Sequence, residues 1–526
     1  MRRTLLALAF ASSIYAQSPA FLAADVHLSG SSPMPFMDVG LLPSGRYQIR
    51  NATMVDLIKT AWGIDTENVV DGPAWIDTDR FDIIAKVPPK STAADREEML
   101  RSLLAERFKL AVHNDKKELT VDEMTVNKRG VQLQESGAPG STDCKGDFNQ
   151  GPPPMVTVNC PSMTMPQFAI RVRQMAGGDV HNLVVDLTGL KGAYAIALKW
   201  TPPGGPKPKD GEESAGQISI LDALDKQLGL TIALGKRMVP VVAIDHVERT
   251  PTANDPDVTK TLPPAVTEFE AATIKLNKSG KEEARLQPKP GGRVEGENIP
   301  LKLLITFAWD FDTNSDDRIV GLPKWGTTDR YDFIAKAAVM PGEQPPPLDD
   351  LRMMIRALLI ERFKITLHTE DQPVKVFTLT VGKRGSKLRA ADPSARSTCN
   401  PSMGQSGSGA AKLPALTLTC QNTTMAQLAT AMHLRAGGYV DHPVVDLTEL
   451  KGGYDFVLTW TPRGALSSSG RGGAKAAETE SASDPSGGTT FFDAVEKQLG
   501  LHLEGGQKHP LPVLVIDHIE PLGLDQ

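Results

Sequence analysis

Two short segments of the chain place paired carboxylates beside an arginine. They read Asp-Arg-Phe-Asp at residues 79–82 and Asp-Arg-Tyr-Asp at residues 329–332. Two carboxylates at one site can serve as general acid and general base, which is hydrolase chemistry. Each segment precedes a predicted strand, however, and two carboxylates three residues apart across a strand start point to different faces. The spacing therefore favours a structural interpretation, in which the arginine bonds loop carbonyls or forms an ion pair.

Histidines recur near strand ends in both halves of the chain. Asp-His pairs stand at 245–246 and 517–518, and His113 and His368 occupy equivalent positions on another predicted strand. Adjacent strand residues face opposite sides, so each Asp-His pair cannot form a dyad with itself. A metal site combining residues 245–246 with His113 is conceivable, but no ligand spacing indicates it. Because the chain also lacks G-x-S-x-G, S-x-x-K, H-E-x-x-H and P-loop motifs, we predict no catalytic residue, no metal and no cofactor.

The tryptophans are the next candidates, because every one of them is duplicated. They could line a groove for a carbohydrate or peptide, or they could fill the core. Trp75 and Trp325 lie in proline-containing loops before strands and should be the most exposed pair. Together with Arg80 and Arg330 they form our candidate ligand-binding set. The six tryptophans pair as Trp62 with Trp309, Trp75 with Trp325, and Trp200 with Trp460.

A tandem duplication explains these repeated residues. Residues 184–200 read VVDLTGLKGAYAIALKW, and residues 444–460 read VVDLTELKGGYDFVLTW. A repeat this clear predicts two homologous domains. We place a signal peptide at 1–16, the first repeat at 21–249, a Pro/Thr/Asp-rich linker at 250–268 and the second repeat at 269–521. The linker carries no apolar periodicity and should be extended and mobile.

Hydrophobic periodicity predicts a mixed α/β fold of the α+β class in each repeat. In the first repeat we expect helices near 53–62, 95–106, 165–175 and 218–228. The expected strands are 81–86, 108–113, 121–127, 183–187, 193–200, 230–234 and 239–247. One segment in the first half of each repeat can be laid on a segment of the second half without a gap, as residues 103–126 on 223–246 show, which suggests two βαββαβ lobes per repeat. The predicted lobes span about 47–130 and 160–249, then 295–385 and 420–520; one mixed sheet per repeat is the alternative.

The N-terminus and the charge narrow the cellular location. Residues 1–16 combine two arginines, a short apolar run and a plausible cleavage site, as a signal peptide does. No later segment is long and apolar enough for a transmembrane helix. The formal charge of −6 argues against nucleic acid or an anionic membrane surface as a partner. We therefore expect a secreted or periplasmic protein.

The four cysteines fit an oxidising compartment. Cys144 and Cys160 follow one Lys-Arg-Gly landmark, and Cys399 and Cys420 follow its duplicate. Three pairings are possible in principle, and the duplication favours one local disulfide in each repeat. A zinc site is the competing interpretation, but neither pair has further ligands at the right spacing.

Several motifs together resemble one known family. They are the FEAATIK start at 269–275, the TDR(F/Y)D block, LL-x-ERFK(L/I), VVDLT-x-LKG-x-Y and the EKQLGL…VIDHIE ending. The chain resembles a large, uncharacterised family of secreted proteins expanded in soil bacteria, defined by a domain of unknown function. The resemblance covers nearly all of both repeats and implies an extracellular sensing or interaction role. The second lobe also resembles the short N-terminal domain of secretins and TonB-dependent receptors, which docks partners through strand edges and helix faces.

The sequence thus favours a secreted, non-catalytic protein that binds or senses a partner at the cell envelope or outside the cell. Its partner would be an envelope protein, a peptide or a glycan. An extracellular hydrolase using aspartates and histidines at strand ends is the alternative. A purely structural envelope protein is a third possibility.

Overall fold

The computed structural model describes most of both repeats. The described residues are 19–30, 36–136, 144–149, 154–176, 180, 182–201, 218–280, 283–311, 316–338, 346–393, 395–406, 413–467 and 488–523. The predicted signal peptide at 1–16 lies outside them. Among the described residues, no helix combines the length and apolar character needed to cross a membrane.

The first repeat alternates short strands and helices. Its elements are, in chain order, β1 (Ala23–Leu28), β2 (Asp38–Leu41), β3 (Arg46–Thr53), α1 (Met54–Trp62), η1 (Thr66–Asn68), β4 (Val69–Val70), η2 (Ala74–Asp77), β5 (Arg80–Lys86), α2 (Ala93–Arg107), β6 (Ala111–Val126), β7 (Gln134–Glu135), β8 (Lys145–Asn149), β9 (Met155–Thr164), α3 (Met165–Ala176), β10 (Leu183–Asp186), β11 (Ala193–Trp200), α4 (Ile220–Ala223), η3 (Leu224–Leu228) and β12 (Leu230–His246).

A short helix, α5 (Val258–Thr261), lies between the repeats, and the second repeat follows the order of the first. Its elements are β13 (Ala271–Leu276), β14 (Arg285–Lys289), η4 (Pro290–Gly292), β15 (Arg293–Pro300), α6 (Leu301–Ala308), η5 (Asp316–Arg318), β16 (Ile319–Val320), α7 (Lys324–Thr328), β17 (Arg330–Lys336), α8 (Leu348–Phe363), β18 (Thr366–Val381), β19 (Arg389–Ala390), β20 (Thr398–Ser406), β21 (Leu413–Thr423), α9 (Met425–Arg435), β22 (Val444–Asp446), β23 (Tyr454–Trp460), α10 (Arg463–Ser467), α11 (Phe491–Ala494), η6 (Val495–Leu499) and β24 (Leu501–His518).

Each repeat contains three four-stranded sheets. In the first repeat they are sheet A (β1-β5-β3-β2), sheet B (β10-β6-β12-β4) and sheet C (β7-β11-β9-β8). In the second repeat they are sheet D (β13-β17-β15-β14), sheet E (β16-β24-β18-β22) and sheet F (β19-β23-β21-β20). The predicted mixed α+β class with two repeated segments is confirmed.

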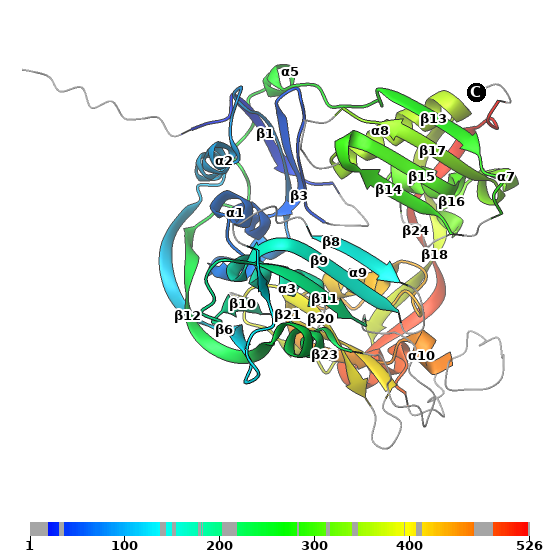
Figure 1. The fold of residues 1–526 in the computed structure, drawn as a ribbon. Helices are drawn as coiled ribbons and strands as arrows, with labels where there is room; N and C mark the ends of the chain where they lie inside the picture. The colour runs from blue at the N-terminus through cyan, green and yellow to red at the C-terminus, as the bar shows by residue number, and fades with distance from the viewer. Residues whose placement is uncertain are drawn as a thin grey trace, which may run out of the picture.

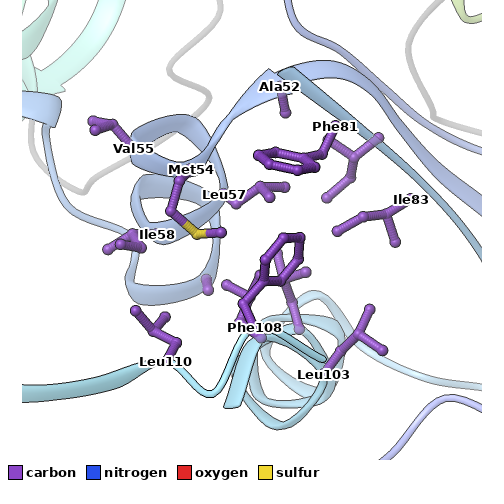
Figure 2. Packing of buried hydrophobic residues seen from close by; sticks show 14 of the residues in the cluster. Ala52, Met54, Val55, Leu57, Ile58, Phe81, Ile83, Leu103, Phe108 and Leu110 are labelled. Atoms are coloured by element: carbon purple, nitrogen blue, oxygen red, sulfur yellow. The ribbon is translucent and has the colours of Figure 1, made fainter. Parts of the chain in front are cut away.

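The core of sheet A shows why these elements form. Thr53 begins α1 with a capping box, in which its hydroxyl accepts from the Asp56 amide and the Asp56 carboxylate accepts from the Thr53 amide. Gly63, in the left-handed conformation, ends the helix. The apolar side of α1 packs with α2 on sheet A around Phe81 and Phe108, whose ring centroids lie 4.9 Å apart (Figure 2).

Two long strands differ from the sequence prediction. We expected separate strands at 108–113 and 121–127, but β6 is one continuous strand, and β12 likewise joins the strands expected at 230–234 and 239–247. The antiparallel pair of β6 and β12, like that of β18 and β24, curves along one side of the molecule (Figure 1). One end of each pair packs in one core and the other end in the next. The boundaries of two separate lobes therefore stay a prediction.

The linker at 250–268 is not the extended, mobile segment that its composition predicts. It contains α5 and packs against the first repeat (Figure 1). Arg46 donates to the Pro263 carbonyl at 2.7 Å, and Asn254 bonds the main chain of Val26. The segment has no apolar periodicity because it is rich in proline, threonine and aspartate. Its observed contacts are hydrogen bonds between side chains and main-chain groups, together with the buried apolar residue Val258.

The cysteines pair locally. Cys144 bonds Cys160, and Cys399 bonds Cys420, as the duplication predicts. In the second repeat the bridged residues face each other across β20 and β21. Each bridge therefore links two neighbouring strands of the third sheet of its repeat, β8 with β9 in sheet C and β20 with β21 in sheet F.

Candidate functional site

The carboxylate of Asp82 sits at an irregularity between β3 and β5. The register shifts there, and Asn51 takes a left-handed conformation with φ of 57°. Asp82 Oδ1 accepts from the Asn51 amide at 2.8 Å and from Ser29 Oγ at 2.6 Å, while Oδ2 accepts from Arg50 at 2.9 Å. Burial alone would raise the pKa of Asp82, but these hydrogen bonds hold it below its usual value. Asp82 therefore acts as an ionised clamp on a β-bulge.

The second repeat builds the same clamp. Asn298 has φ of 58° at the shift between β15 and β17. Its amide donates to Asp332 Oδ1 at 2.9 Å, and Asn277 donates to the same oxygen at 2.6 Å. The last aspartate of both Asp-Arg-aromatic-Asp segments therefore stabilises the backbone.

A third clamp lies in sheet F and was not recognised from the sequence. The Asn422 amide donates to Asp455 Oδ1 at 3.0 Å, and Asn422 also has a positive φ, 44°. The corresponding bulge of sheet C has Ser162 and Ala195 at these positions. The recurring feature, an Asn two residues before a helix cap and an Asp on the next strand, is a sequence signal that could have been found. Its presence in both sheet D and sheet F supports an internal duplication within the second repeat.

The other members of the first segment also serve structure. Arg80 Nη1 donates to the Asn51 carbonyl at 2.6 Å, so it braces the same bulge from the other side. Asp79 accepts from Arg249 Nε at 2.5 Å and from Nη2 at 3.1 Å. Arg330 begins β17 and is half-buried. Asp79 and Asp82 thus have separate partners and share no reacting centre.

The two candidate tryptophans are half-buried and lie against the cores. Trp75, in η2, meets Phe81 edge-on with ring centroids 6.2 Å apart. Trp325, in α7, stacks on Phe363 at 6.5 Å. Both contribute to packing, and each keeps part of its surface in solvent.

The histidines form cross-strand pairs with aspartates. His113 Nδ1 lies 2.8 Å from Asp245, and His368 Nδ1 lies 3.0 Å from Asp517. The hydrogen bond to Asp517 raises the pKa of His368 above its usual value, with Glu370 adding to the effect. All four side chains are about half exposed on the long strand pairs. Within the part of the chain that the structure describes, no three His, Cys, Asp or Glu side chains are arranged to hold a metal.

A hollow of about 200 Å³ lies in the second repeat beside α6 and α7. Its lining is Pro300, Lys302, Leu303, Thr306 and Thr327. None of the candidate aspartates or histidines lines it. The groups that a hydrolase would need are therefore not gathered in this hollow.

A polar cluster around Arg396 joins the two repeats, and the sequence did not indicate it. Arg396 enters the first repeat and donates to both oxygens of Asp77, at 2.6 and 3.1 Å, with side chains 23% and 9% exposed. Its Nη1 donates to the carbonyls of Thr66 and Val69 at 3.1 and 2.8 Å. The Asp77 carboxylate and the two carbonyls thus form a slot for one guanidinium group, and Arg396 of the second repeat occupies it. At the position of Asp77 the second repeat has Thr327, so the slot exists in one copy only.

Comparison with known proteins places this architecture in a family. No curated protein and no solved structure matches the chain significantly. A family model described as "Protein of unknown function (DUF3738)" matches residues 55–247 and again residues 302–519, which together make up more than half of the chain. One match lies within each of the two repeats, and the chain belongs to the DUF3738 family, of which it carries two tandem copies.

Proposed function

We propose that this chain is a secreted or periplasmic, non-catalytic binding protein whose two repeats act side by side. Its partner would be an envelope protein, a peptide or a glycan. The observation that carries the proposal is the structural use of the supposed catalytic groups, since Asp82 and Asp332 clamp bulges in both repeats. A general acid or base must reach a substrate, whereas both carboxylates already accept hydrogen bonds from the bulge backbone and from neighbouring side chains.

Location outside the cytoplasm is supported by the disulfides, because such bonds persist in oxidising compartments. Contacts between the repeats also bear on how binding would work. The packed linker and the Arg396 slot hold the copies together, so a partner would meet one composite surface. Independent capture by two tethered domains would need a free linker.

The test is capture of partners from envelope and culture-medium extracts by the chain from residue 17 to residue 526, followed by mass spectrometry. We expect a reproducible partner that is also captured by the double variant His113→Ala, His368→Ala. Binding does not need these histidines, whereas a hydrolase built on the His-Asp pairs would.

A different result would establish an enzyme in place of a binding protein. Degradation of an envelope or extracellular polymer by the wild-type chain, lost in the double variant at an unchanged melting temperature, would establish the hydrolase. The matched control is Lys236→Ala, a change in an exposed ion pair on β12, the strand that pairs with the His113 strand β6. It should alter neither capture nor turnover.

A further inference from the structure

The arginine that joins the repeats lies three residues before a disulfide. Arg396 precedes β20, and Cys399 of that strand lies directly opposite its disulfide partner, Cys420 of β21. Three residues of chain span at most about 11 Å. The place at which Arg396 leaves the second repeat is therefore set by how the start of β20 is fixed to β21.

Two further contacts fix this loop to β21, one on each side of Arg396. Asn422 Nδ2 donates to the Ala395 carbonyl at 2.5 Å, and Thr423 Oγ1 donates to the Thr398 carbonyl at 3.1 Å. Asn422 and Thr423 are 6% and 2% exposed, so both donors lie in the packed part of sheet F. The loop is thus fixed to one stretch of β21 by a covalent bond and two hydrogen bonds.

The first repeat keeps the disulfide but not these two donors. Ser162 and Met163 stand at the positions of Asn422 and Thr423, and methionine has no hydroxyl to donate. The slot for a guanidinium group is likewise present in one copy only. The disulfide of the first repeat therefore serves as an internal comparison for that of the second.

The disulfide of the second repeat lies at the edge of its sheet. β20 is an edge strand of sheet F, and Cys399 is half-buried, whereas Cys420 is 3% exposed. A dithiol reductant can attack the sulfur of Cys399 and release the Cys420 thiolate, and its second thiol then resolves the mixed disulfide. The reductant loses two electrons and two protons and becomes a disulfide, and the chain gains two cysteine thiols.

We propose that the Cys399–Cys420 disulfide holds Arg396 in the Asp77 slot, so that reduction of this one bridge loosens the contact between the repeats. With the bridge closed, the loop is already ordered, and little conformational entropy is lost when the arginine enters the slot. Reduction frees the start of β20, and the ordering cost then falls on the contact with Asp77. This redox-sensitive switch goes beyond the proposed binding function, because it determines whether the two repeats present one composite surface.

The test measures amide hydrogen exchange by mass spectrometry in residues 64–79, the segment that contains the slot. Arg396 ties η1, β4 and η2 of this segment together through two carbonyls and the Asp77 carboxylate, so an empty slot should let its amides exchange faster. For the chain from residue 17 to residue 526, we expect the double variant Cys399→Ser, Cys420→Ser to raise exchange here at least about fivefold. Combining it with Arg396→Ala should give no more than Arg396→Ala alone, because both changes empty the same slot.

The matched control is the double variant Cys144→Ser, Cys160→Ser, which removes the other bridge. Its exchange in residues 64–79 should stay within about twofold of wild type, and dithiothreitol should then raise it by reducing the remaining bridge. Thr423→Val, which keeps the bridge but removes one hydrogen bond to the loop, should give a smaller rise.

Two results would overturn the proposal. One is unchanged exchange in residues 64–79 when the Cys399–Cys420 bridge is removed by substitution or reduced in the control variant. The other is an effect of bridge removal that multiplies that of Arg396→Ala, because the bridge and the arginine would then act independently. If Cys399→Ser, Cys420→Ser fails to fold, reduction of the control variant under native conditions decides. No partner is present in these measurements, so their outcome is independent of partner capture.

Discussion

Sheets A and D have the same fold, but their outer faces have different surroundings. Ile84 of β5 and Ile334 of β17 occupy the same register, opposite β3 and β15 respectively. Ile84 is 7% exposed because the second repeat covers sheet A, whereas Ile334 is 49% exposed. The start of α8 makes the cover, as the buried hydrogen bond from Gln48 to Asp350 at 2.9 Å shows. Duplication thus produced two similar sheets, of which one became an interface.

Substitutions between the copies explain why, among the described residues, sheet A is covered and the same face of sheet D is not. A methyl group at Gly40 of β2 would lie 2.0 Å from Pro347 Cγ, so glycine is needed for α8 to approach. Gln287 stands at that place in β14. Glu295 replaces Gln48, and it would repel Asp95, the first repeat's counterpart of Asp350. Sheet D is therefore unsuited to receive another copy by the same contact, which limits further head-to-tail assembly.

The largest expected effect comes from breaking the slot between the repeats. Arg396→Ala removes every donor to Asp77 that the slot provides and leaves that carboxylate, 9% exposed, without its partner. Breaking one side of such a buried pair costs about 3 kcal/mol of unfolding free energy. Urea denaturation followed by tryptophan fluorescence measures the loss.

The control for this change lies on the open face of sheet D. Arg293→Ala also removes an ion-paired arginine, but both partners are partly exposed, and we expect a change within about 0.5 kcal/mol. Equal effects of Arg293→Ala and Arg396→Ala would contradict the claim that the repeats are held together by a buried contact.

Truncating Ile84, and Ile334 for comparison, should give the next largest loss of unfolding free energy. Ile84→Ala should destabilise the chain by about 2–3 kcal/mol, because it opens a cavity under the second repeat. Ile334→Ala removes the same atoms from a half-exposed site and should cost less than about 1 kcal/mol. The comparison is made by urea denaturation of both variants under one condition. A larger loss for Ile334→Ala would mean that sheet D, too, is covered.

The fold was largely readable from sequence because hydrophobic periodicity and helix caps are local signals. The helix begun by Thr53 and the strand at 80–86 both follow their apolar pattern. The continuous course of β6 was not readable. Its middle residues, 114–118, are polar and mostly exposed, so no period of two marks them as strand.

The interface between repeats was beyond prediction for a different reason. Arg396 lies in a loop, and Asp77 lies in a short 3₁₀ helix 319 residues away, so no periodicity relates them. The repeat does not help to predict the interface. Comparing the two copies identifies the residues that they share, whereas the interface is made by residues that differ between them. The sequence favoured a structural interpretation of the segment at 79–82. The bulge that Asp82 stabilises depends on a positive φ at Asn51, which the sequence indicates only weakly.

The smallest expected effect is a pH dependence centred on Asp350. Burial raises the pKa of this carboxyl to about 6, against the hydrogen bond from Gln48 and the charges of Arg46 and Arg50. A folded pKa above the unfolded value means that the folded state binds the proton more tightly. Stability should therefore increase as pH falls from 7.5 through 6 towards 4. Burial also raises the pKa of Asp38 in the same interface, so it contributes in the same direction.

Asp350→Asn isolates the share of this one group. The amide keeps an acceptor for Gln48 and carries no charge, so the variant should be about 1 kcal/mol more stable than wild type at pH 7.5. That advantage should shrink at pH 5, where the wild-type carboxyl is largely protonated. Asp95→Asn, at the same position of α2, is the matched control: Asp95 caps its own helix, and its hydrogen bonds with Thr92 lower its pKa. Removing the charge of Asp95 should destabilise the start of α2 at both pH values. At pH 7.5 the change in unfolding free energy should therefore have opposite signs for the two variants. Equal signs would mean that the interface does not desolvate Asp350.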